Sequence, residues 1–163
     1  MAKNILYALG VSLLIIQFIR PEKNVSSGPY QNDISTKFPM SKEVASAFKN
    51  ACYDCHSNHS KYPWYFNMQP VAWWLQHHID EGKSELNFNE FASYSPKKQD
   101  HKLEEIAEAV TEGWMPLKPY KLVHKESALS EDQKKAIIAW VNQSRSTLNN
   151  TQAIFEQLGN EDE

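Results

Sequence analysis

The sequence has little cysteine and no excess of positive charge. Only two cysteines, Cys52 and Cys55, occur among the 163 residues. A secreted domain held by disulfides carries more cysteines at wider spacing, and a structural zinc site usually needs four ligands in two separated pairs. The formal net charge is −3, so the chain has no overall positive charge of the kind that favours nucleic-acid binding. These features exclude a disulfide framework and a structural zinc site, and they argue against nucleic acid as a partner.

The chain also lacks internal repeats and convincing alternation of apolar and polar residues. Its length allows one compact domain with a short appendage. Apolar residues make up 41% of the chain and charged residues 23%, which is ordinary for a globular core. The sequence therefore predicts an all-α domain.

An apolar run covers residues 5–19 and is followed by Arg20 and Pro21. Its length lies between the core of a signal peptide, roughly 7–15 residues, and a membrane span, roughly 20. A buried soluble helix is disfavoured because the run has no charged face. The small residues that signal peptidase needs occur only downstream, at 25–27. We therefore predict an uncleaved signal-anchor or transmembrane helix over residues 1–20, with a cleaved signal as the alternative. Both export the rest of the chain.

The remainder divides by composition into a linker, a helical domain and a tail. Pro, Gly, Ser and Asn are frequent in residues 21–40, which predicts an extended linker. Helix caps and apolar periodicity predict about four helices with long loops over residues 41–148. The predicted helices begin at Ser41, Pro70, Ser95-Pro96 and the capping box of residues 130–133, and the second and third stop near Gly82 and at Gly113. Residues 149–163 are predicted to be a polar tail.

The chemical signal is the run Cys52-Tyr53-Asp54-Cys55-His56. Two thiols at positions i and i+3 can each add across one vinyl group of haem, and the following histidine can then bind the iron. This spacing is the attachment signature of c-type haem. A redox dithiol is the alternative, but such a motif follows a strand, whereas this one follows a predicted helix. We therefore predict one haem c attached through Cys52 and Cys55, with His56 as iron ligand.

A pure electron carrier needs a second iron ligand opposite His56. Met115 is the best placed, because it lies in a non-helical segment far enough downstream to cover the other face of the haem. A plain packing role for Met115 and ligation by His77 or His78 are the alternatives. A methionine ligand prefers ferrous iron and raises the potential. The remaining side chains considered as ligands are Met40, Met68, His59, His101 and His124.

The surroundings of the haem can be predicted less closely. The proximal imidazole should donate its other N–H to a backbone carbonyl, which we expect in residues 63–70. Four tryptophans are expected to be divided between pocket walls and ordinary core: Trp64, Trp73, Trp74 and Trp114.

Several separate motifs resemble a known family. They lie at residues 20–24, 52–58, 62–65, 69–74, 81–83, 115–116 and 120. Together they are similar to the small bacterial haem-binding domain family related to cytochrome c, over roughly residues 20–145. The resemblance implies a cytochrome c-like fold in which the first and last helices of the domain cross at Phe48 and Trp140. It also implies His56 as proximal and Met115 as distal ligand. One departure is Ala45 and Ala47, where cytochromes c typically place a glycine.

The function expected from these features is haem binding and electron transfer by a monohaem c-type cytochrome, not an enzyme. The haem domain is expected in the periplasm, held to the outer face of the cytoplasmic membrane by the N-terminal helix, or soluble there after signal cleavage. The expected partners are redox proteins. A haem-based redox or gas sensor and a small peroxidase-like enzyme are the alternative functions, the second because His77, His78 or His124 could serve as an acid/base group near the iron.

Overall fold

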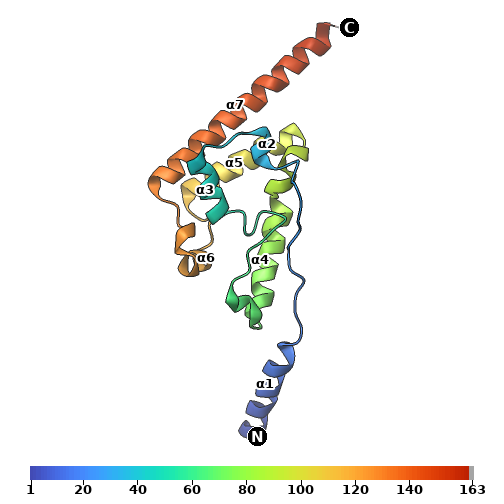
Figure 1. Cartoon of the computed structure of the whole chain (residues 1–163), viewed down its shortest axis with the longest axis vertical. Coiled ribbons are helices and arrows are strands. Elements are labelled where there is room, and N and C mark those ends of the chain that lie inside the picture. The colour runs from blue at the N-terminus through green and yellow to red at the C-terminus, as the bar shows by residue number, and fades with distance from the viewer. Residues whose placement is uncertain (162–163) are drawn as a thin grey trace.

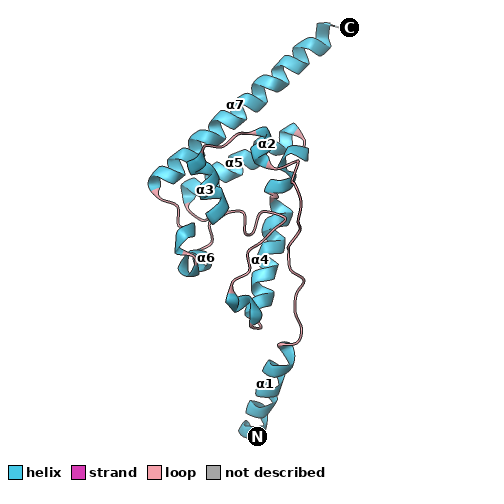
Figure 2. Cartoon of the chain, in the orientation of Figure 1, coloured by secondary structure: helices cyan, strands magenta, loops and turns pink. Residues whose placement is uncertain are grey.

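The structure, a computed structural model, describes residues 1–161 and is helical. Within these residues there is no β-strand, and the only β pairing is an isolated bridge between Val25 and His59. Figure 2 shows the helices joined by long loops. The α-helices are α1 (Ala2–Ile16), α2 (Ile34–Lys37), α3 (Lys42–Ala51), α4 (Val71–Glu85), α5 (Pro96–Glu112), α6 (Lys118–Val123) and α7 (Glu131–Glu161), and the 3₁₀ helices are η1 (Trp64–Asn67), η2 (Phe88–Ser93) and η3 (Lys125–Ser127). The all-α prediction is confirmed.

All four predicted helix starts are confirmed: α4 begins directly after Pro70 without a side-chain cap, and the other three have one. The hydroxyls of Ser41 and Ser95 accept hydrogen bonds from the backbone N–H groups of residues 44 and 98. Ser130 and Gln133 form the reciprocal capping box that begins α7. Gly113 ends α5 with a φ of 73°, a left-handed conformation that glycine adopts without a steric cost.

The main core lies where α3, α5 and α7 pack together with η2 (Figure 1). The rings of Phe48 in α3 and Trp140 in α7 meet edge to face, with centroids 5.2 Å apart. This is the contact expected between the first and last helices of the domain. On the other side of Phe48, the ring of Phe88 lies at 5.3 Å. Each of these aromatic side chains buries a large apolar area in the core.

A second, smaller cluster of buried residues lies between α4 and η1. It consists of Phe66, Ala72, Leu75 and Ile79. In Figure 1, the N-terminal half of α4 and η1 extend away from the main core as an arm. The segment between α3 and η1, which contains both cysteines, therefore connects the two clusters.

Arg145 in α7 forms a two-pronged ion pair with Asp100 in α5, with N–O distances of 2.8 and 3.0 Å. The Arg145 hydrogen bonds hold the pKa of Asp100 below its usual value. The stabilisation is therefore present above the unfolded pKa of about 3.9 and is lost as the pH falls through the lower folded value. We expect Arg145→Met to reduce the free energy of unfolding by about 1 kcal/mol at pH 7. In urea unfolding, the difference from the parent should shrink below about pH 4; a constant difference would contradict this.

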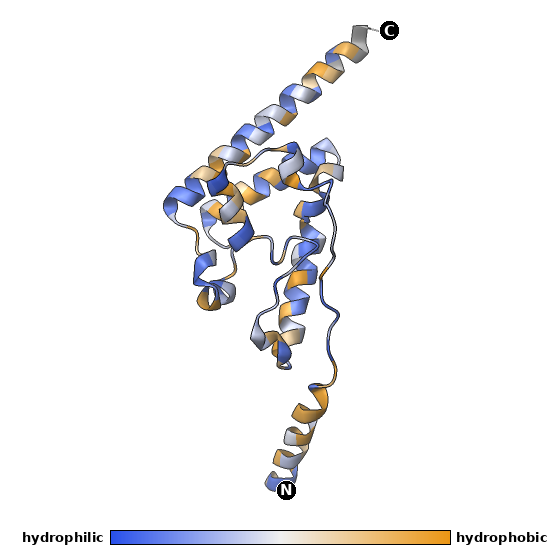
Figure 3. Ribbon diagram, in the orientation of Figure 1, coloured by the Kyte–Doolittle hydropathy of each residue, from blue (hydrophilic) through white to orange (hydrophobic). Residues whose placement is uncertain are grey.

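The N-terminal helix α1 is largely apolar (Figure 3), and none of its side chains is buried. Among the helices within residues 1–161, none combines the length and the apolar character needed to cross a membrane. The helix predicted at the N-terminus is present, but its prediction as a membrane span is not confirmed.

Several segments differ in structure from the sequence prediction, and α6 is a further helix between the third and fourth predicted ones. Part of the 21–40 segment is packed: α2 forms within it, and Ile34 and Phe38 belong to the main core. The loop expected over residues 83–95 contains η2, and two of its phenylalanines are buried in the main core. The helix α7 continues through the predicted tail to Glu161. Short helices that lack a repeated apolar pattern leave little signal in a sequence.

Candidate functional site

The Cys52–His56 motif begins where α3 ends. Cys52 is the C-terminal cap of α3, and its carbonyl oxygen accepts the backbone N–H groups of Cys55 and His56, at 3.2 and 3.0 Å. Both cysteines are free thiols. Cys52 packs against the main core and Cys55 against the smaller cluster. The tight turn therefore places the two thiols and His56 at the junction of the two clusters.

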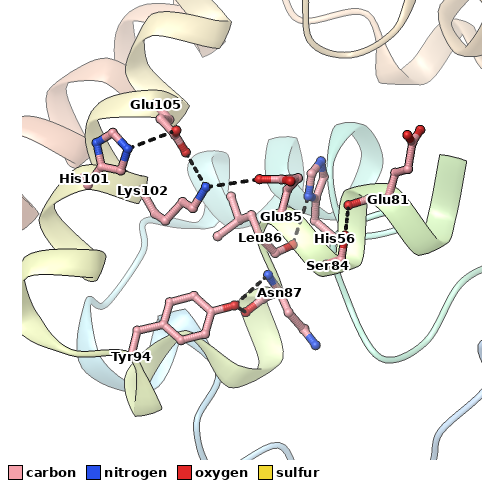
Figure 4. Close-up of polar contacts among 10 residues, drawn as sticks. All are labelled: His56, Glu81, Ser84, Glu85, Leu86, Asn87, Tyr94, His101, Lys102 and Glu105. Carbon is pink, nitrogen blue, oxygen red and sulfur yellow. Dashed lines mark hydrogen bonds and ion pairs between the residues drawn. The ribbon is translucent and has the colours of Figure 1, made fainter.

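The His56 imidazole is held by a backbone carbonyl. Its Nδ1 lies 3.0 Å from the carbonyl oxygen of Leu86, the C-terminal cap of α4 (Figure 4). Burial lowers the pKa of His56, which favours the neutral imidazole, the form that binds metals. With Nδ1 as the donor, Nε2 carries the free lone pair. The sequence prediction placed the carbonyl that holds His56 within residues 63–70, and this was wrong. The helix α4 ends later than predicted, and its C-terminal cap brings the Leu86 carbonyl to the His56 ring.

The carbonyl that holds His56 is itself fixed on both sides. Glu85, one residue before it, pairs with Lys102 of α5 at 3.6 Å. Asn87, one residue after it, donates its backbone N–H to the Tyr94 hydroxyl at 3.0 Å. These contacts are drawn in Figure 4. Fixing the partner of a histidine ligand fixes the orientation of its ring.

Gly82 allows α4 to approach the motif closely. A Cβ at this position would lie 3.1 Å from the carbonyl oxygen of Cys55, 3.2 Å from its Cβ and 3.4 Å from Cε1 of His56. The residue lies inside α4, where glycine is disfavoured by about 1 kcal/mol relative to alanine. The sequence prediction treated it as the end of the helix. An isolated glycine within a helical pattern often marks a close approach of backbones, and that signal could have identified it.

The two thiols are protonated at neutral pH. Burial, with Cys55 nearby, raises the pKa of Cys52 to about 12. Burial, together with the charge of Asp54, raises the pKa of Cys55 to about 11. Reactive dithiols have thiolates stabilised by positive charge and lowered pKa values. These environments therefore disfavour a redox dithiol and suit thiols that serve as attachment points.

Buried polar side chains hold the middle of the motif from both sides. Asp33, before α2, accepts hydrogen bonds from the Tyr53 hydroxyl at 3.0 and 3.1 Å and from the Asn89 amide at 2.7 Å. Asp54 accepts a hydrogen bond from the Tyr120 hydroxyl at 2.7 Å. Sequence analysis missed Asp33, and it named Tyr120 as a motif residue without pairing it with Asp54. Each of these pairs joins segments that are distant in the chain.

The Asp54–Tyr120 bond brings α6 to the motif, and α6 follows closely after Met115. Met115 is half-buried and lies between α5 and α6. The C-terminal end of α6 also contacts η1. The Tyr65 hydroxyl lies 2.7 Å from Nε2 of His124, which caps α6. The Met115 segment is thus tied at its downstream end to the motif and to η1. Ligation of iron by Met115 stays a prediction.

The other side chains considered as ligands are dispersed. Met40 packs against the main core, and Met68 is exposed at the end of η1. His59 contacts the Ser26 carbonyl, and His101 pairs with Glu105. His77 and His78 lie beside Glu81 on α4.

The four tryptophans named as pocket walls or core, Trp64, Trp73, Trp74 and Trp114, are all substantially exposed. None of the four belongs to either buried cluster, so the expectation that some of them are ordinary core residues is wrong.

Residues 11–143 match the haem-binding domain family. The chain belongs to this family. No curated protein matches the chain, and no solved structure matches it. Membership supports a haem cofactor, and the residues of this haem-binding protein fit one. The Nδ1 of His56 is committed to the Leu86 carbonyl, which leaves Nε2 free to bind a metal, and Cys52 and Cys55 are free thiols in the same turn.

Proposed function

We propose that this haem-binding protein is a monohaem c-type cytochrome that transfers electrons and is not an enzyme. Cys52 and Cys55 would hold the haem covalently, and His56 and Met115 would bind its iron. Haem iron bound in this way supplies a one-electron centre whose potential a methionine ligand raises. The observation that carries the proposal is the His56–Leu86 hydrogen bond of 3.0 Å directly after the two free thiols.

The protein's own residues would provide rigidity and shielding around this centre. The Leu86 carbonyl orients His56, and the Glu85–Lys102 and Asn87–Tyr94 contacts keep that carbonyl in place. Lys102 also places a positive charge near His56, which disfavours the protonated imidazole. A ligand set that does not rearrange lowers the cost of changing the iron's oxidation state. These features support a carrier of single electrons that exchanges them with other redox proteins.

We also propose that the haem domain works in the periplasm, held at the outer face of the cytoplasmic membrane by the N-terminal segment. The apolar side chains of α1, most of which are exposed, support this placement. The end of α1 is joined to the domain by a reciprocal amide pair: Gln17 Nε2 donates to the Gln69 carbonyl at 3.2 Å, and the Gln69 N–H donates to Gln17 Oε1 at 3.0 Å. A soluble periplasmic protein after signal cleavage is the alternative.

The proposal is tested by the mass and spectrum of the protein purified from a host with a cytochrome c maturation system. We expect a mass increased by one haem that survives denaturation. We also expect a low-spin, six-coordinate spectrum in both oxidation states and little binding of carbon monoxide to the ferrous protein. Haem that is released on denaturation would contradict covalent attachment. Ready binding of carbon monoxide by the native protein would favour the sensor or peroxidase-like function, which needs an open iron site.

A further inference from the structure

Three potential metal ligands lie together on one face of α4, separate from the cysteine motif. Glu81 is four residues after His77 and three residues after His78, and both spacings place side chains next to each other on a helix. The Glu81 Oε2 atom lies 3.4 Å from His77 Nε2 and 3.9 Å from His78 Nδ1. One ligand atom from each of the three residues lies within 4.8 Å of the others. The carboxylate therefore lies between two imidazole nitrogens.

The His78 nitrogen in this group lacks a partner. Its Nδ1 is buried and makes no hydrogen bond, and it is the one such side-chain atom found in the part of the chain that the structure describes. The Trp74 ring packs against the imidazole, with centroids 4.4 Å apart. Buried polar atoms without a partner are uncommon and cost free energy. This nitrogen lies 3.9 Å from Glu81 Oε2, which is beyond hydrogen-bond distance.

The distances suit a small divalent transition metal. When four ligands surround zinc at about 2.1 Å, neighbouring ligand atoms lie about 3.4 Å apart, which is the His77–Glu81 distance. Two imidazoles and one carboxylate are a common zinc ligand set, with a fourth position left for water. We propose that His77, His78 and Glu81 bind one Zn²⁺ ion on the surface of α4. This site is independent of the proposed electron transfer.

The proposal is tested by isothermal titration of ZnCl₂ into the haem-loaded full-length protein after treatment with a chelator. We expect one zinc ion per chain. His77→Ala, His78→Ala and Glu81→Gln should each weaken binding about tenfold or more, since removal of even an outer partner of a metal ligand costs that much. The haem spectrum of each variant reports whether it has folded.

His101→Ala is the matched control. His101 Nε2 lies 3.3 Å from Glu105, also four residues later on a helix, and the His101 side chain is 64% exposed against 66% for His77. This pair lacks a second histidine, and the variant should bind zinc as the parent does. The proposal is overturned if no zinc binds, if only one or two of the three substitutions weaken binding, or if the control loses as much. A change of iron coordination in His77→Ala or His78→Ala would also overturn it.

Discussion

Replacing Gly82 by valine should destabilise the protein and reduce the fraction of chains that carry haem. The new Cβ would lie 3.1 Å from a backbone oxygen of Cys55 and 3.4 Å from the His56 ring. A backbone oxygen cannot rotate away as a side chain can, so α4 or the motif must move. Either movement strains the His56–Leu86 hydrogen bond, because Leu86 belongs to the same end of α4. One substitution thus displaces Cys55, a proposed attachment point, together with His56, a proposed iron ligand.

The size of the effect depends on two opposing terms. A residue with a Cβ gains about 1 kcal/mol or less of helix propensity over glycine, whereas overpacking a close contact costs about 1–3 kcal/mol and occasionally more. We expect Gly82→Ala to lie between neutral and about 2 kcal/mol less stable. With two more carbons and a branched Cβ, Gly82→Val should lose about 3 kcal/mol or more. Denaturant unfolding and haem absorbance per chain measure both quantities.

Gly10 provides the control, because it also lies inside a helix but has no atom within 4 Å of the position of a Cβ. Gly10→Ala should retain the haem content of the parent. If Gly82→Val keeps the unfolding midpoint and the haem content of the parent, the close approach does not matter to the site.

The parts of this fold that were predicted from sequence are those with a local or periodic signal. Ser41, Ser95 and the capping box at Ser130 begin helices through hydrogen bonds within one turn. Phe48 and Trp140 lie on apolar stripes that predict which faces turn inward, and their rings do meet. The cysteine spacing is a signal of the same local kind, because the haem attachment that it predicts involves five consecutive residues.

The parts that were missed depend on contacts between distant segments. Asp33 lies in a polar stretch that resembles a linker, and only its tertiary partners Tyr53 and Asn89 make it a fixed part of the site. The Leu86 carbonyl depends on where α4 ends. The low helix propensity of glycine predicted that the helix ends near Gly82. In the structure α4 packs closely against the cysteine motif at Gly82 and continues to Glu85. Tertiary contacts override local propensity in such places.

Replacing Met115 by alanine should lower the reduction potential and open the iron. A thioether stabilises ferrous iron relative to ferric, so its loss should lower the potential on the order of 0.1 V, part of the ~0.8 V range that axial ligands set. The ferrous variant should bind carbon monoxide readily, whereas the parent should not. Potentiometric titration followed by the haem spectrum measures the first effect, and carbon monoxide difference spectra measure the second.

Two further variants separate ligation from packing. Met115→His should keep a six-coordinate, low-spin iron but lower the potential, because a second imidazole favours ferric iron more than a thioether does. Met68→Ala removes an exposed methionine at the end of η1 and should leave both the potential and the spectrum unchanged. Parent-like behaviour of Met115→Ala would show that another side chain binds the iron. Because Tyr120 ties the segment after Met115 to Asp54 inside the motif, loss of the sulfur alone should leave that segment in place. The iron then becomes open through a missing ligand and not through a displaced loop.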